Sequence, residues 1–239
     1  MQRPSRCGCR HWHRAGVTPT LAIVGFSEPV SSVTHLIGAG VFAVLGGMLI
    51  ARSHRSALRV VALVVYAVGV VFALAMSGVF HLLDPGSTAR AVLRRLDHAG
   101  IFFLIAATYT PIHVIQFRGV MRWGVLALVW ACAITGIVFK AVFFDRIPEW
   151  VGLTLYLGLG WVGIVSLLLL QRRHGWTPLG PLVWGALAYT VGAALEFARW
   201  PVPLPGIVGP HELFHLFVLA GVSWHFVYIW RLLPVEEDA

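Results

Sequence analysis

The sequence predicts an all-α, polytopic integral membrane protein with seven transmembrane helices in one bundle, and three observations lead to this prediction. Of the 239 residues, 58% are apolar and only 12% are charged, whereas soluble domains carry about 25% charged residues. The mean hydropathy is +0.81. Seven apolar runs are each long enough to cross the hydrocarbon of a bilayer, which takes about 20 helical residues. A soluble globular enzyme is therefore excluded.

The seven predicted spans are separated by gaps that carry charges, glycine or proline, as at 52–55, 84–87, 171–178 and 200–206. Such residues interrupt helices and mark the connecting loops. No room remains for a second domain, so residues 27–233 are predicted to form one transmembrane domain. The spans are Val33–Ala51, Leu58–Leu83, His98–Phe117, Trp123–Phe144, Trp150–Leu170, Leu179–Ala198 and His211–Leu233.

Residues 1–26 and 234–239 lie outside this domain. The first segment is a basic leader without the apolar core of a secretory signal, and we expect a disordered arm. Its cysteines and histidines could chelate a metal, but ordering such a flexible segment is costly, so the arm is the favoured interpretation. The last segment is a short acidic tail. The candidate ligands in the leader are Cys7, Cys9, His11 and His13.

The chain carries 18 basic and 10 acidic residues, a formal net charge of +8. The basic residues are scattered between the apolar runs and form no stripe, so the expected partner is membrane lipid rather than nucleic acid. Lysine and arginine number 10 on the amino-terminal side of the membrane and 8 on the other. This excess, together with the arginines of the leader, predicts a cytoplasmic amino terminus and a place in the cell (plasma) membrane.

Ionisable residues that interrupt the apolar runs gather on one face of the predicted membrane domain. With seven spans, the ends at which these residues stand all lie on the amino-terminal side. Polar groups at the edge of the hydrocarbon are costly, so their gathering predicts a functional site. The alternative is that each one reaches water independently. The residues are Glu28, His35, His81, Asp97, His98, Glu196, His211, Glu212 and His215.

The strongest local pattern is GlyProHisGluLeuPheHis at 209–215, which opens the last span. His211 and His215 are four residues apart, so they project from one face of a helix. There they could hold one cation, and zinc suits imidazole ligands. His81, near the end of the second span, could complete a set of three histidines. Such a set leaves zinc a fourth, open position, as in catalytic zinc sites.

Two more residues could act beside the metal. Ser77 lies four residues before His81 and shares its helix face. Asp97 stands at the start of the predicted third span and could hold or deprotonate water on the zinc. Alternatively, Asp97 caps the third helix, a position that aspartate favours.

HisGluLeuPheHis also matches the zincin pattern, in which Glu212 would be the general base. Only 24 residues follow His215, and no downstream ligand readily reaches the site. A protease of standard zincin layout is therefore disfavoured.

Other residues inside the spans have structural interpretations. His225 lies about 15 Å deeper than His215 along the helix, so we expect a buried, hydrogen-bonded ring there. Four glycines of the first span are expected to be close-packing positions between helices. They are Gly38, Gly40, Gly46 and Gly47.

Three segments carry a family resemblance. They are SerGluProValSerSerValThrHis at 27–35, SerGlyValPheHis at 77–81 with residues 97–101, and ProHisGluLeuPheHisLeuPheVal at 210–218. Together they resemble the hemolysin III family, bacterial relatives of the adiponectin and progestin receptor (PAQR) proteins. The likeness covers nearly all of the chain after the leader.

The resemblance implies a seven-helix bundle with a zinc ion near its cytoplasmic side. Residues matching Asp97 and Ser77 are thought, in the wider superfamily that includes alkaline ceramidases, to support hydrolysis of a lipid amide. Glu28 and His35 match the first family segment, where they either pack against the site or take a direct part in it. Glu196 matches no family motif. The zinc ligands that the resemblance implies are His81, His211 and His215.

Two classes of function remain open. The first is a zinc-dependent hydrolase of an amide or ester in a lipid-like substrate, with zinc polarising the carbonyl. The second is a non-catalytic regulator of membrane state, or a cytolytic (hemolysin) protein, in which zinc is structural. A protease of unusual ligand geometry, with Glu212 as its base, is a third interpretation.

Overall fold

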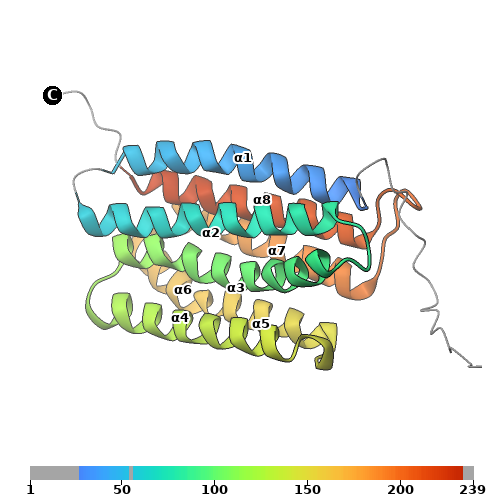
Figure 1. Cartoon of the computed structure of the whole chain (residues 1–239). Helices are drawn as coiled ribbons and strands as arrows, with labels where there is room; N and C mark the ends of the chain where they lie inside the picture. Colours follow the sequence, from blue (N-terminus) through green and yellow to red (C-terminus); the bar gives the residue numbers. More distant parts are fainter. Residues whose placement is uncertain (1–26, 54–55, 234–239) are drawn as a thin grey trace, which may run out of the picture.

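The computed structural model describes residues 27–53 and 56–233 and places most of them in α-helices. Figure 1 shows these helices side by side along one direction, as a bundle. Seven helical segments are long and apolar enough to cross a membrane, which confirms the predicted seven spans. The leader at 1–26, with its candidate metal ligands, and the acidic tail at 234–239 lie outside the described residues.

Among the described residues, eight α-helices make up the seven spans, because the fifth span consists of two helices. Short 3-10 helices η1 (Phe144–Arg146) and η2 (Thr177–Leu179) stand before α5 and α7. The helices are α1 (Pro29–Ala51), α2 (Ala57–Leu82), α3 (Thr88–Gln116), α4 (Gly119–Val142), α5 (Glu149–Trp161), α6 (Gly163–His174), α7 (Gly180–Ala198) and α8 (Pro210–Arg231).

The fifth span differs from the single helix predicted over Trp150–Leu170. It is interrupted at Val162, where α5 ends and α6 begins. Glycines at 158, 160 and 163 surround the break, and glycine is a poor helix former. The hydroxyl of Tyr109 on α3 lies 2.8 Å from the carbonyl oxygen of Gly160 and 3.2 Å from that of Leu159. A side chain of another helix therefore satisfies backbone carbonyls at the break, as a membrane interior requires.

The third helix starts ten residues earlier than predicted, at Thr88 instead of His98. Ser87 caps it by accepting a hydrogen bond from the amide of Arg90 at 3.1 Å. Asp97 therefore lies well inside α3, and the interpretation of Asp97 as the helix cap is wrong. The difference arises because a hydropathy count stops at charged residues, whereas a helix can continue beyond the edge of the hydrocarbon.

The first helix also starts earlier than predicted, at Pro29 instead of Val33. Proline is favoured in the first turn of a helix, where its missing amide hydrogen costs nothing. The early start leaves Glu28 directly before the helix, at its N-cap position.

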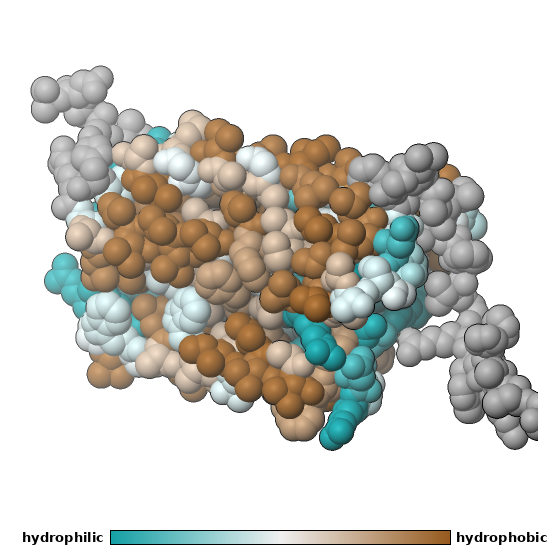
Figure 2. Space-filling view, in the orientation of Figure 1, coloured by the Kyte–Doolittle hydropathy of each residue, from teal (hydrophilic) through white to brown (hydrophobic). Residues whose placement is uncertain are grey.

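The first four helices pack against one another in chain order, so that α2 lies between α1 and α3 (Figure 1). The last helix, α8, packs against α7 and α1. Figure 2 shows apolar side chains covering the middle of the visible face, with hydrophilic ones toward the ends. The up-and-down path brings the amino-terminal ends of α1, α3 and α8 to the same end of the bundle as the carboxyl-terminal ends of α2 and α7.

Two of the four glycines predicted to pack closely do so. A Cβ at Gly46 would lie 2.8 Å from Cβ of Ala67 on α2, and a Cβ at Gly38 would lie 2.7 Å from a leucine methyl group of α8. The prediction is wrong for Gly40 and Gly47, which are exposed and have no heavy atom within 4 Å of a built Cβ. These two glycines lie on the face of α1 that points away from the other helices. The presence of glycine in a span does not reveal which face of the helix packs against a neighbour.

The adjacent glycines of α1 provide a matched test of this packing. Replacing Gly46 by alanine is expected to lower stability by about 1–3 kcal/mol, because the new methyl group overlaps one fixed to the α2 backbone. Replacing Gly47 by alanine should leave stability unchanged or raise it by up to about 1 kcal/mol. Thermal unfolding in a single detergent measures both variants. Equal stabilities would contradict the close approach of α1 and α2.

Candidate metal centre

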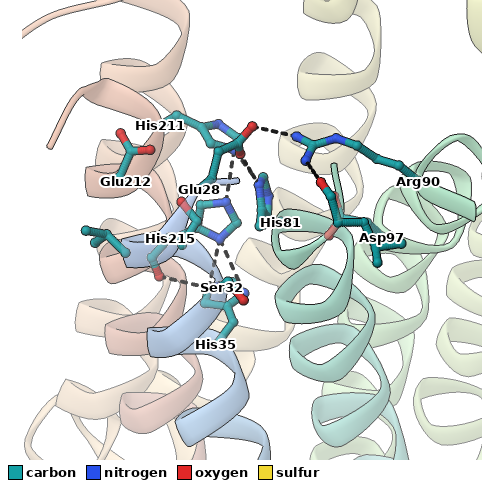
Figure 3. A network of polar contacts seen from close by, with 12 residues as sticks. Glu28, Ser32, His35, His81, Arg90, Asp97, His211, Glu212 and His215 are labelled. Atoms are coloured by element: carbon teal, nitrogen blue, oxygen red, sulfur yellow. Dashed lines mark hydrogen bonds and ion pairs between the residues drawn. The ribbon is translucent and has the colours of Figure 1, made fainter. Parts of the chain in front are cut away.

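Histidines from three helices meet at the end of the bundle where α2 finishes and α1 and α8 begin. His81 lies in the last turn of α2, and His211 and His215 lie in the first two turns of α8. Their ring centroids are 4.6–5.0 Å apart. His35 of α1 lies beneath them, as Figure 3 shows. The predicted meeting of the second and last spans on one side is therefore present.

The three rings turn the same nitrogen toward one another. Nε2 of His211 lies 3.4 Å from Nε2 of His81 and 3.0 Å from Nε2 of His215. Nitrogens bound to one tetrahedral zinc ion at 2.0–2.1 Å would be about 3.3 Å apart. One ligand atom from each residue lies within 4.8 Å of the others. The three histidines are thus close enough to hold a metal ion.

Two of these rings have partners on α1 or just before it. Nδ1 of His81 forms a short hydrogen bond and ion pair with the carboxylate of Glu28. Nδ1 of His215 lies 3.0 Å from Nε2 of His35, and both side chains are buried. Partners of this kind fix the tautomer and orientation of metal-ligating histidines. For His215 to bind a metal through Nε2, its Nδ1 must carry the proton. Nδ1 of His35, 3.3 Å away, can accept a hydrogen bond from it while Nε2 of His35 donates to the carbonyl of His215.

Glu28 contacts the end of α2 through both its backbone and its side chain. Its amide donates to the carbonyl of His81 at 3.1 Å, which fastens the start of α1 to the end of α2. Its carboxylate also accepts a hydrogen bond from Arg90 of α3 at 2.5 Å. Partial burial favours the neutral carboxyl, but the hydrogen bond from His81 and the positive charges around it outweigh burial and lower the pKa of Glu28 to about 2. The group is therefore a carboxylate at neutral pH.

Ser77 and Asp97 stand near the histidines without being bound to them. Ser77 is buried one turn before His81, and its hydroxyl has no hydrogen-bond partner among the described residues. A buried polar group without a hydrogen-bond partner costs about 1–3 kcal/mol. A substrate atom that formed a hydrogen bond with this hydroxyl would remove that cost. The side chain of Asp97 on α3 is 15% exposed and lies 3.6 Å from the ring of His98. Among the described residues, neither group forms a hydrogen bond or ion pair with His81, His211 or His215.

Three other ionisable residues take structural roles. Glu212 is buried, and its Oε2 accepts a hydrogen bond from the amide of Gly209 at 2.8 Å, which caps α8. Figure 3 shows Glu212 apart from the three rings, on the side away from His81. His98 bonds through Nδ1 to a carbonyl of its own helix at 2.8 Å, and His225 bonds to a carbonyl of α7 at 3.4 Å. The hydrogen-bonded state predicted for His225 is confirmed.

Glu196, at the end of α7, faces one of the three histidines, a contact that the sequence did not predict. Its Oε2 lies 3.5 Å from Nδ1 of His211. The one signal in the sequence was its position, since the end of the sixth span falls on the same membrane face as the histidines. That position did not reveal which residue it would meet.

Residues 25–226 match the family described as Haemolysin-III related. This chain belongs to that family. The chain is 34% identical to Hemolysin-3 of Bacillus cereus over 213 residues, which are 88% of this chain and 94% of the relative. Membership and the seven apolar helices make it a multi-pass membrane protein.

Two further relatives, one bacterial and one human, are also similar to this chain. The Hemolysin-3 homolog of Bacillus subtilis (strain 168) is 29% identical over 197 residues, covering 81% of this chain and 88% of the relative. The human Monocyte to macrophage differentiation factor is 24% identical over 232 residues, covering 92% of this chain and 90% of the relative. The similarity of this haemolysin-III-related protein to its relatives thus extends over nearly their whole lengths.

Removal of one histidine tests the metal centre. Wild-type protein loaded with zinc is expected to hold about one ion per chain, and His211→Ala to hold little, because only two imidazoles remain. Elemental analysis of purified protein by mass spectrometry measures the content. His174→Ala is the control, since His174 is an exposed histidine at the end of α6. Equal zinc in wild type and His211→Ala would contradict the assignment.

Replacing Glu212 separates the capping role from a catalytic one. Glu212→Gln is expected to retain zinc and any turnover within about twofold, because a glutamine oxygen can accept the same hydrogen bond from the Gly209 amide. Glu212→Ala should lower stability by about 0.5–2 kcal/mol through loss of the cap. Thermal unfolding and zinc content measure these effects. A folded, zinc-loaded Glu212→Gln variant without activity would instead support the protease interpretation.

Proposed function

We propose that this protein is a zinc-dependent hydrolase that cleaves an amide or ester bond in a lipid-like substrate. The observation that carries the proposal is the convergence of three Nε2 atoms from α2 and α8. Three histidines leave one position of a tetrahedral ion open for substrate or water, whereas structural zinc sites are closed by four protein ligands. When bound, zinc would polarise the scissile carbonyl and activate water at neutral pH.

Two residues supply the remaining chemistry in this proposal. The carboxylate of Asp97 would accept a proton from the attacking water as general base. The hydroxyl of Ser77, which is buried and has no hydrogen-bond partner among residues 27–53 and 56–233, would donate to the carbonyl oxygen as negative charge develops there. Neither group is paired with His81, His211 or His215 among the described residues.

The location of the histidines supports a substrate drawn from the membrane. They lie at helix ends, where hydrocarbon meets the interfacial region in which the amide or ester bonds of lipids are found. Apolar side chains nearby on α1 and α8 face outward, for example Ile37 at 62% and Leu216 at 42% exposure. A lipid could therefore approach without leaving the bilayer. In this proposal, the end of the bundle that carries the histidines faces the cytoplasm, as the small excess of lysine and arginine on the amino-terminal side predicts.

A second candidate function is non-catalytic. Two curated relatives are named as hemolysins, and a metal bound by His81 with His211 and His215 would join α2 to α8. In that function, zinc stabilises the bundle of a membrane-state regulator or cytolytic protein.

Variants of the two catalytic candidates test hydrolysis. With fluorescent lipid amides and esters in mixed micelles, Asp97→Asn is expected to reduce turnover about 10²–10⁴-fold and Ser77→Ala about 10²–10³-fold, with zinc retained in both. Asp145→Asn is the control, because this carboxylate is 74% exposed and pairs with Arg95. Unchanged turnover in the Asp97 and Ser77 variants would refute these roles.

The same preparation separates the two candidate functions. A zinc-loaded wild type that turns over none of these lipids, and that unfolds when zinc is chelated, would favour structural zinc. Leakage of dye from lipid vesicles that persists after chelation would favour the cytolytic alternative.

A further inference from the structure

Glu196 is bound on two sides, in the way that Glu28 is bound. Glu28 stands between His81 and an arginine of α3. Glu196 stands between His211 and Arg199, with its Oε1 2.7 Å from the Arg199 guanidinium and its Oε2 3.5 Å from Nδ1 of His211. Two of the three converging imidazoles therefore each face a carboxylate that an arginine holds.

The second oxygen of Glu196 has no competing partner. Oε2 is buried and accepts no hydrogen bond from the rest of the described chain, although the whole side chain is 19% exposed. The Nδ1 of His211 is the group it faces at ion-pair distance. A small rotation of the imidazole would turn this contact into a hydrogen bond.

The backbone at Arg199 is shaped to hold Glu196. Arg199 directly follows α7 and has a φ of 54°, the left-handed conformation that glycine favours after a helix. Its amide donates to the carbonyl of Glu196 at 3.3 Å, so the residue folds back over the last turn of α7. The guanidinium then reaches Glu196 and, at 2.7 Å, Glu149.

We propose that Glu196 is the positioning residue for His211 as a metal ligand, with Arg199 holding Glu196 in place. The carboxylate accepts the hydrogen bond from Nδ1–H of His211, which leaves Nε2 deprotonated for the ion and makes the ring a stronger ligand. The inference rests on the metal-binding part of the proposed function and not on hydrolysis.

The outer ion pair contributes much less. The side chains of Arg199 and Glu149 are 54% and 61% exposed, and exposed ion pairs are weak because water and salt screen them. The expected effect on zinc affinity therefore comes from the carboxylate of Glu196, which faces His211.

Zinc affinity of the full-length protein tests this inference. In competition with a chromophoric chelator, Glu196→Ala is expected to bind zinc about 10–100-fold more weakly than wild type. Glu196→Gln should lose less, because its amide oxygen still accepts the hydrogen bond without the charge. Asp145→Asn, which removes one exposed acidic charge between α4 and α5, should bind zinc as wild type does.

A second measurement distinguishes positioning from a structural role. With cobalt(II) in place of zinc, the ligand-field absorption of Glu196→Ala is expected to shift, because the orientation of His211 changes. Thermal unfolding of the metal-free variant should match that of metal-free wild type.

Wild-type zinc affinity in Glu196→Ala would overturn the inference. An unchanged cobalt spectrum, together with a destabilised metal-free protein, would also overturn it in favour of a purely structural role. Failure of the wild type to bind zinc would refute both the inference and the proposed function. Zinc binding without lipid turnover, with the predicted loss in Glu196→Ala, would support the inference and refute hydrolysis alone.

Discussion

The imidazoles that meet at one end of the bundle each need a partner for the nitrogen that does not face the other rings. An unpaired polar group is costly where water is scarce, and the rings of His81 and His215 are buried, so partners from neighbouring helices stabilise them. Glu28 directly precedes the first span, His35 lies in that span, and Glu196 comes from the sixth. The need to satisfy these nitrogens ties the helix ends together and thereby positions the site.

The start of α1 shows how this works locally. The hydroxyl of Ser32 donates to the carbonyl of Gly78 at 2.8 Å, and a Cβ at Gly78 would lie 2.7 Å from Leu36. The two helices can approach this closely because position 78 has no side chain. The same approach brings Glu28 against His81, so backbone packing and the orientation of the His81 ring have one cause.

The opposite end of the bundle uses polar residues differently. His113 of α3 is fully buried, with Nδ1 2.8 Å from the carbonyl oxygen of Met121 and Nε2 3.1 Å from the hydroxyl of Ser166. Both ring nitrogens are satisfied by neutral groups, which joins α3 to α4 and α6 and leaves neither nitrogen for a ligand. Among residues 27–53 and 56–233, the end with Glu28 and Glu196 is therefore the one that combines converging histidine nitrogens with charged partners.

Hydropathy and spacing were enough to predict the seven spans, the common membrane face of the ionisable residues and the helical pair His211 and His215. These features are local or follow from counting, because span length depends on apolar run length and two residues four apart share a helix face. The sequence did not reveal the true start of α3, the break at Val162 or the outward position of Gly47. It also did not reveal which residues His35 and Glu196 would contact. The tertiary structure decided these features, because each depends on contacts between segments that are distant in the sequence. His35 and His215, for example, are 180 positions apart. The periodicity of one helix carries no information about which neighbouring helix it will contact.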